Sequence, residues 1–243
     1  MQPLSQPLTC FKAYDIRGRL DEDLTVENAY RIGRAFAQTL DAKRVVLGRD
    51  VRPSSAGLAE AVARGVMDTG AEVLDLGLSG TEETYFATDH LDACAGLCVT
   101  ASHNPMEYNG MKMVQRGAAP IGADSGMAAI KALAESGDYA PDVEGGKWTD
   151  ASDTRSAYVS SMLSFASISA LKPLKILVNP GNGAAGPTFD AIAEALEKAR
   201  APWQFIRMHH TPDGTFPNGI PNPLIEANQP PTSDAVKREG ADL

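Results

Sequence analysis

A regular alternation of short apolar runs with amphipathic stretches constrains the fold of this 243-residue chain more than any other feature. The strand-like runs lie at 45–47, 72–76 and 95–100, and the helix-like stretches lie at 25–40, 53–66 and 81–91. In the helix-like stretches, apolar residues recur every three or four positions, which is typical of a helix with one buried face. Strands that alternate with helices usually join a parallel sheet through right-handed crossovers. The sequence therefore predicts an α/β fold, with a mixed, mostly parallel sheet sandwiched by helices.

Capping residues indicate where several helices begin and end. Thr25 is expected to cap the first helix, and Pro53, Ser54 and Ser55 the second. Further along the chain the pattern predicts helices at 123–136, 156–167, 187–200 and 233–239, and strands at 175–178 and 203–208. Gly240 suits the position just after a helix, where a left-handed residue is needed.

The stretch 137–153 is rich in Gly, Pro and Asp and has little periodicity, so we place a domain boundary there. It separates a first domain, 1–145, from a second, 154–243. The second domain shows only two strands, and two strands make a poor sheet. We expect this domain to be incomplete.

Charge and composition narrow the classes of partner. The net charge is −9, with 43% hydrophobic and 22% charged residues. Such a surface repels nucleic acid and anionic membranes, although a local basic pocket could still bind a small phosphorylated ligand. Residues 1–9 lack the features of a signal peptide and no apolar run is long enough to span a membrane, which predicts a cytoplasmic protein. The cysteines Cys10, Cys94 and Cys98 are interpreted as reduced thiols.

Ser102 is the strongest candidate for chemistry. It follows the apolar run Leu97–Val99 within the sequence Thr100-Ala101-Ser102-His103-Asn104-Pro105, and Asn109-Gly110-Met111-Lys112 comes soon after. A serine on a turn at the end of a buried strand keeps its hydroxyl exposed. Phosphoryl transfer needs an acceptor oxygen, positive charge to stabilise the phosphoryl group, and an acid or base for the hydroxyl that exchanges it. Ser102 could supply the oxygen, Lys112 the positive charge and His103 the acid or base.

A second motif lies near the N-terminus, where Tyr14-Asp15-Ile16-Arg17-Gly18 reads as a strand that ends in a glycine turn. Taken alone, Arg17 could be an ordinary solvated arginine. As a neighbour of the serine turn, it would supply a second positive charge. The Asn179–Gly183 turn matches no phosphate-binding spacing and is interpreted as structural.

Together these two motifs resemble the α-D-phosphohexomutase family, the bacterial phosphomannomutases and phosphoglucomutases. The resemblance extends to Gly77–Thr88, to Asn182–Pro187 and to Thr211–Pro223, and it covers the chain from residue 9 onward. It implies a phosphoglucomutase-like domain I that carries the active serine, followed by part of domain II. The mannose branch, which supplies GDP-mannose for surface polysaccharides, is the nearest likeness.

The resemblance also implies roles for single residues. Ser102 would carry the phosphate, exchange it with the sugar and give one oxygen to Mg²⁺. Arg17 and Lys112 would flank it and assist proton transfer, His103 would lie in the same loop, and Tyr14 would line the substrate cleft. Mannose 6-phosphate and mannose 1-phosphate would interconvert through a bisphosphorylated sugar, with hexose 1,6-bisphosphate as activator.

This sequence departs from the family pattern at its end. The family's aspartate-rich metal loop would follow Gly240-Ala241-Asp242, and domains III and IV would follow that loop. The resemblance therefore predicts that the 243 residues alone have little mutase activity. Two alternatives remain open, which are a phosphoglucomutase of the same family and a non-catalytic phosphosugar-binding module.

Overall fold

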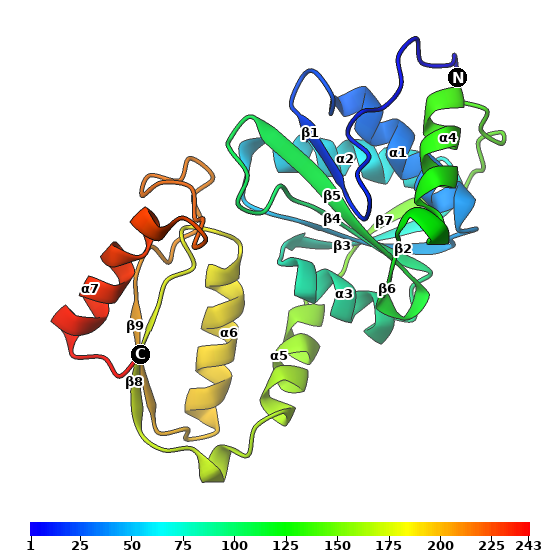
Figure 1. Ribbon diagram of the computed structural model, residues 1–243. Helices are drawn as coiled ribbons and strands as arrows, with labels where there is room; N and C mark the ends of the chain where they lie inside the picture. The colour runs from blue at the N-terminus through cyan, green and yellow to red at the C-terminus, as the bar shows by residue number, and fades with distance from the viewer. The chain divides into compact units, whose positions relative to one another are not determined.

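The computed structural model describes residues 1–243, which form two compact units, Met1–Thr154 and Arg155–Leu243 (Figure 1). The first unit is built on one seven-stranded sheet in the order β1-β5-β4-β2-β3-β7, with β6 paired to β5. Its strands are β1 (Ile16–Arg19), β2 (Arg44–Arg49), β3 (Glu72–Leu78), β4 (Ala95–Val99), β5 (Tyr108–Gln115), β6 (Ala119–Pro120) and β7 (Lys147–Asp150). Strands β4, β2, β3 and β7 are parallel, whereas β5 is antiparallel to β1, β4 and β6.

Helices cover both faces of this sheet, which confirms the predicted α/β sandwich. The helices are α1 (Val26–Thr39), α2 (Pro53–Met67), α3 (Thr81–His90) and α4 (Met127–Ser136). Figure 1 shows α1, α2 and α4 on one side of the sheet and α3 on the other. Strand β2 contributes to both faces, because Val45 and Leu47 lie in the core with α1 and α2 while Val46 packs with the residues on the α3 side. Alternate residues of a strand point to opposite faces, so a strand buried on both sides is apolar throughout.

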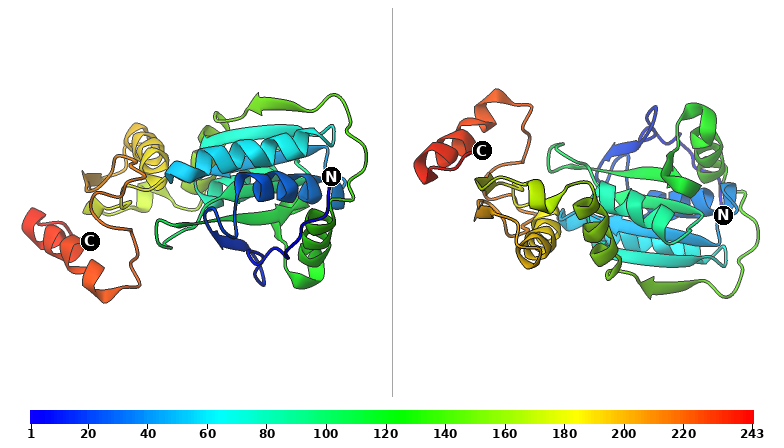
Figure 2. Two further views of the ribbon diagram at one scale, coloured as in Figure 1. Left: turned by 90° about the horizontal axis from the view of Figure 1, so that it is seen from above. Right: turned by 90° about the horizontal axis from the view of Figure 1, so that it is seen from below.

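The first two helices pack so closely that they leave no room for side chains at two glycines. Figure 2 shows α1 and α2 side by side over the sheet. A Cβ on Gly33 would lie 2.4 Å from the carbonyl oxygen of Val62, and a Cβ on Gly65 would lie 2.2 Å from that of Tyr30. The glycines therefore let the two helix backbones touch, which brings both helices onto the same sheet face.

Some predicted helix starts are confirmed and others are wrong. The helix predicted from 81 begins at Thr81, whereas those predicted from 156, 187 and 233 begin at Thr154, Ala185 and Pro230. Thr25 caps α1 as predicted, because its hydroxyl oxygen accepts a hydrogen bond from the Asn28 N–H. Pro53 is the first residue of α2, which has no side-chain cap, so the expected capping by Ser54 and Ser55 is wrong. Helix α4 begins at Met127 rather than at 123, because Gly126 has a φ of 126° and interrupts the helical backbone.

Three strands of the first unit were not expected from the sequence, namely β5, the two-residue β6 and β7. Strand β5 holds the Asn109–Lys112 motif, and β7 lies inside the stretch 137–153 that was expected to be irregular. Strands β5 and β7 both depend on pairing with residues far away in the chain, since β5 pairs with β1 and β4 and β7 pairs with β3. Residues 147–150 of this stretch therefore belong to the first unit's sheet.

The second unit contains a parallel pair, β8 (Leu174–Val178) and β9 (Trp203–Arg207), with α5 (Thr154–Ser164), α6 (Ala185–Lys198) and α7 (Pro230–Glu239). The last residues lie along the other edge of β8, where Asp242 N–H donates to Lys175 and Leu177 N–H donates to Leu243. Helix α7 ends at Glu239, and the next residue, Gly240, has the left-handed φ of 59° that the sequence predicted.

In the second unit, hydrogen bonds of Asn182 hold the irregular segment that follows β9. Buried Asn182 donates to the Thr211 carbonyl at 2.8 Å and accepts from Asn218 at 2.9 Å, so the Asn179–Gly183 turn anchors the segment after β9.

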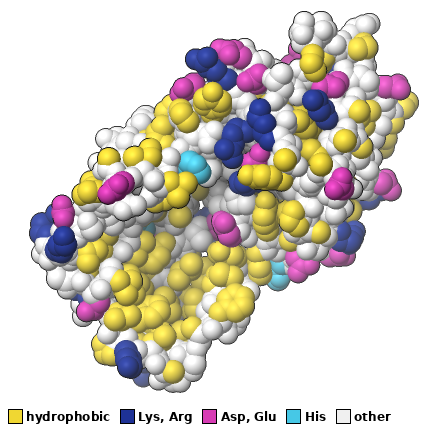
Figure 3. All heavy atoms as spheres, in the orientation of Figure 1, with side chains coloured by type: hydrophobic (Ala, Val, Ile, Leu, Met, Phe, Trp, Pro, Cys, Tyr) yellow, Lys and Arg dark blue, Asp and Glu magenta, His cyan; other side chains and the backbone are white.

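Figure 3 shows hydrophobic side chains over much of this unit's surface, and Phe165 and Leu224 are about four-fifths exposed. No helix of the structure is both long and apolar enough to cross a membrane.

The contact between α1 and α2 gives a matched pair of glycine variants. We expect Gly65→Ala to lower the free energy of unfolding by about 1–3 kcal/mol, because the new methyl group overlaps the Tyr30 carbonyl. Gly57→Ala, on the same helix but with open space around it, should leave stability unchanged or raise it by up to about 1 kcal/mol. Urea unfolding measures both, and equal losses in the two variants would contradict the close helix contact.

Candidate active site

Ser102 lies on a tight loop just after β4 and has an unusual backbone conformation. Its φ is 54°, in the left-handed region that residues other than glycine rarely adopt, and its side chain is exposed. The Ser102 N–H donates to Thr100 Oγ1 at 2.9 Å, and Ser102 Oγ lies 3.3 Å from His103 Nδ1. The fold thus presents the hydroxyl to solvent while the backbone of the same residue is held.

The two predicted cations, Arg17 and Lys112, lie on neighbouring strands. In the register of β1 and β5, Arg17 is opposite Gly110, which places it on the same sheet face as Lys112 two residues further on. Arg17 Nη1 donates to Asn104 Oδ1 at 3.1 Å, so Arg17 contacts the Ser102 loop directly. The antiparallel pairing of β1 with β5 therefore unites the two sequence motifs.

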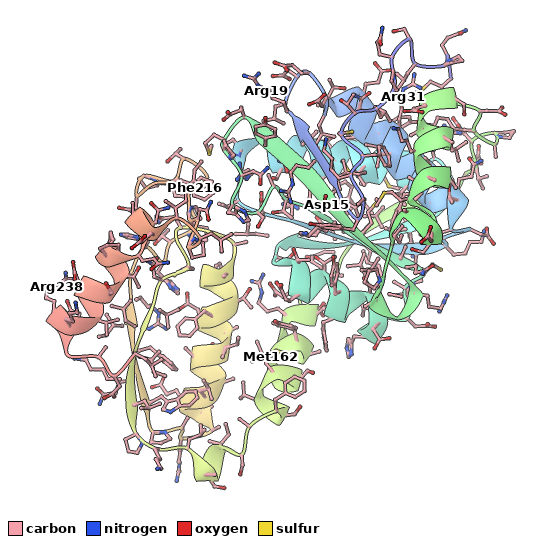
Figure 4. The ribbon with its side chains drawn as sticks, in the orientation of Figure 1. Asp15, Arg19, Arg31, Met162, Phe216 and Arg238 are labelled. Carbon is pink, nitrogen blue, oxygen red and sulfur yellow. The ribbon has the colours of Figure 1, made fainter.

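Asp15 links the two cations and was not predicted as a site residue. Its Oδ2 atom lies 3.1 Å from Arg17 Nη2 and 3.7 Å from Lys112 Nζ. The carboxylate is nearly buried, whereas both cations are about 30% exposed. Figure 4 labels Asp15 just before β1. A buried carboxylate shared by two cations fixes both of them and lowers their mutual repulsion.

Gly110 has a defined steric role in this arrangement. A Cβ at residue 110 would lie 2.2 Å from the Ile16 carbonyl oxygen and 3.0 Å from that of Thr100. Only glycine lets β1 and the start of the serine loop approach β5 this closely. The buried neighbour Asn109 donates to Ser54 and Ser55 at the start of α2, which ties β5 to that helix.

Arg52 is a second residue that sequence reasoning missed. Its side chain is 1% exposed. It donates to the backbone carbonyls of Ser102, Asn104 and Pro105 in the serine loop, which joins β4 to β5, and to that of Tyr108 at the start of β5. Burial lowers the pKa of the Arg52 guanidinium and nearby Asp50 opposes that effect. One signal was available, since Arg52 follows a strand of the predicted mostly parallel sheet, and parallel strands end at the same sheet edge.

The other residues singled out in the sequence are Tyr14 and the cysteines, which differ in their exposure to solvent. Tyr14 is 68% exposed beside Asp15, so its ring is accessible to a ligand. Burial raises the pKa of the Cys98 thiol on β4 to about 12 and that of Cys10 to about 11, which keeps both thiols neutral and unreactive. Ser102 is therefore the accessible nucleophile at the end of β4.

The carboxylates of this chain do not form a cation site by themselves. No group of three or more His, Cys, Asp or Glu side chains is arranged to hold a metal ion. The carboxylate nearest the cations, Asp15, already has Arg17 and Lys112 as partners.

Comparison with known proteins agrees with this geometry. Residues 9–140 match the sequence model of the phosphoglucomutase/phosphomannomutase alpha/beta/alpha domain I, and residues 156–243 match that of domain II. The chain belongs to the phosphoglucomutase/phosphomannomutase family. Ser102, Arg17, Lys112 and Asp15 all lie within the domain I match.

Several members of the family are close relatives of this chain. It is 54% identical over 238 residues to a phosphomannomutase of Salmonella montevideo, covering 97% of this chain and 52% of that protein. It is 50% identical over 239 residues to a Xanthomonas campestris pv. campestris protein named phosphohexose mutases, covering 97% and 51%. The crystal structure of a family protein from Burkholderia thailandensis superposes with a TM-score of 0.81 at 31% identity, covering 96% of this chain and 50% of that one. The chain spans about half the length of the curated relatives it matches.

Loss of the Asp15 carboxylate should weaken the first unit. We expect Asp15→Asn to lower the free energy of unfolding by about 1–3 kcal/mol, because Arg17 and Lys112 then face each other without a shared counter-ion. Added salt should restore part of the loss by screening that repulsion.

The matched control for this prediction is Glu22→Gln, which removes an exposed ion pair with Arg19. It should change stability by less than about 0.5 kcal/mol. Chemical unfolding at low and high salt measures both variants. A loss in Asp15→Asn no larger than in Glu22→Gln would mean that the shared carboxylate does not hold the cations.

Proposed function

We propose that this protein acts in a phosphomannomutase, which exchanges phosphate between O6 and O1 of mannose through a phosphoserine at Ser102. The observation that carries the proposal is an exposed Ser102 hydroxyl on a fixed loop, beside two cations joined by a buried carboxylate. The phosphomannomutase names of several relatives at about 50% identity support the mannose branch. Because the chain spans half of those relatives, the activity is proposed for the protein of which this sequence is part.

In the proposed reaction the P–O bond to Ser102 Oγ breaks while a P–O bond to the free hydroxyl of the hexose phosphate forms. The sugar hydroxyl loses its proton to a base, and Ser102 Oγ regains a proton. The resulting hexose 1,6-bisphosphate turns in the site and returns its other phosphate to Ser102 by the reverse steps. Free hexose 1,6-bisphosphate would restore any enzyme that lost its phosphate.

The residues around Ser102 lie where they could assist the proposed phosphoryl transfer. Arg17 and Lys112 would meet the negative charge that spreads over the phosphoryl oxygens in transfer. His103, whose Nδ1 lies 3.3 Å from Ser102 Oγ, would orient the hydroxyl or carry its proton. Tyr14 would contact the sugar from its exposed position before β1.

Mg²⁺ is part of the proposal as the cofactor, to which phosphorylated Ser102 would offer one oxygen. The chain's own carboxylates do not gather into a magnesium site. The substrate class is a small phosphosugar, and the sugar preference is tested by assaying mannose 1-phosphate beside glucose 1-phosphate.

The decisive experiment is a coupled mutase assay on the protein as its host makes it. With mannose 1-phosphate, Mg²⁺ and catalytic hexose 1,6-bisphosphate, we expect Ser102→Ala to lose at least about 10³-fold in kcat, since the phosphate carrier is gone. Peptide mapping of the wild-type protein should find the phosphate on Ser102.

Ser136→Ala is the matched control, because Ser136 is an exposed serine at the end of α4. It should keep full turnover and should not change the labelling of Ser102. Turnover that survives in Ser102→Ala would refute the phosphoserine route. Faster turnover of glucose 1-phosphate than of mannose 1-phosphate would favour the phosphoglucomutase alternative.

A further inference from the structure

The serine loop turns its backbone carbonyls inward onto one buried guanidinium. Arg52 Nη2 donates to the carbonyls of Ser102 at 3.0 Å and Asn104 at 2.5 Å. Arg52 Nη1 donates to those of Pro105 at 2.9 Å and Tyr108 at 3.2 Å. Buried carbonyls without partners are costly, so these four bonds allow the loop to fold back on itself.

Arg52 also completes a closed ring of contacts around the backbone of Ser102. The Arg52 N–H donates to Asp50 Oδ1 at 3.0 Å, and Thr100 Oγ1 donates to Asp50 Oδ2 at 2.7 Å. Thr100 Oγ1 in turn accepts the Ser102 N–H, while Arg52 binds the Ser102 carbonyl. Both backbone polar groups of Ser102 are therefore fixed by residues that follow β2 or β4.

The ring of contacts offsets the free-energy cost of the left-handed backbone at Ser102. A left-handed conformation at a residue other than glycine costs of order 1–3 kcal/mol and persists only where neighbouring contacts impose it. A guanidinium presents five N–H donors in a rigid plane, so one side chain can bind several carbonyls at once. The cost of burying its charge is offset by Asp50, whose carboxylate lies 3.6 Å from Arg52 Nε.

We propose that Arg52, supported by Asp50, is a positioning residue that holds the Ser102 loop in its outward-facing conformation before any substrate binds. The proposal rests on the proposed function only for the chemical role of Ser102. The positioning itself is a property of the free protein. It can be measured without any turnover.

Hydrogen exchange followed by mass spectrometry on the free protein tests the positioning. In Arg52→Met we expect amides in 100–109 to exchange at least about tenfold faster, because the carbonyl anchor of the loop is lost. Amides of α1 and β3 should change less than about twofold. Arg52→Lys keeps the charge near Asp50 but cannot span four carbonyls, so it should loosen the loop to an intermediate extent.

The controls separate a local role from a general loss of stability. Arg64→Met alters an exposed arginine at the other end of α2 and should leave the loop unchanged. Thr100→Val breaks the ring from the β4 side and should loosen the same amides even if Arg52→Met fails to fold. Low concentrations of guanidinium, compared with urea, should restore protection in Arg52→Met alone.

Two results would overturn the proposal. The first is unchanged protection of the loop in Arg52→Lys and Thr100→Val. The second is an equal loss of protection in the loop, α1 and β3, which would make Arg52 an ordinary stabilising residue of the core. Either result concerns the free protein and leaves the Ser102→Ala test of the proposed function intact.

The mutase assay adds a readout that a purely structural role would not change. In folded Arg52→Lys protein we expect kcat to fall about 10²-fold with little change in KM, because a misplaced nucleophile affects the chemical step more than binding. If kcat is unaffected although the loop exchanges faster, positioning by Arg52 does not serve the chemistry. If Ser102→Ala also keeps its turnover, the proposed function fails independently.

Discussion

The parallel pairing of β2 with β4 is the constraint on which the site depends. It brings the carboxyl ends of these two strands to the same edge of the sheet, so the residues after β2 meet the loop after β4. Asp50 and Arg52 can then bind Thr100 and Ser102 across a distance of fifty residues in the chain. Without this pairing, the serine loop would have no partner for its inward carbonyls, and Ser102 would lose the contacts that impose its left-handed backbone.

A second pairing, between β1, β5 and β4, supplies the charge at the same edge. It places Arg17 and Lys112 on one face, where Asp15 joins them and Asn104 connects Arg17 to the loop. Gly110 makes the approach possible by its lack of a side chain. The candidate site thus combines an exposed hydroxyl with two cations, and buried Asp15 and Arg52 contact the cations and the serine loop. In the proposed reaction, this arrangement would stabilise the charge on a transferring phosphoryl group.

Part of this could be predicted from the sequence, for identifiable reasons. The helices and the strands β2, β3, β4, β8 and β9 were predicted because their apolar residues repeat at helical or strand spacing. Thr25 and Gly240 were found because capping has a local cause. Strands β5 and β7 were missed because their stability comes from partners distant in sequence. The start of α4 was misplaced because the backbone angle of Gly126 leaves no mark in the periodicity.

The candidate site also contains residues that the sequence predicted and residues that only the structure showed. The sequence by itself determined the candidate groups, since Ser102, His103, Arg17 and Lys112 lie in two motifs that chemistry and family resemblance both single out. Only the tertiary structure decided that Asp15 bridges the two cations and that Arg52 anchors the serine loop. A local motif records which atoms can react, because that depends on residue type. Which buried groups hold those atoms in place depends on strand register and on the meeting of strand ends, which no short stretch of sequence contains.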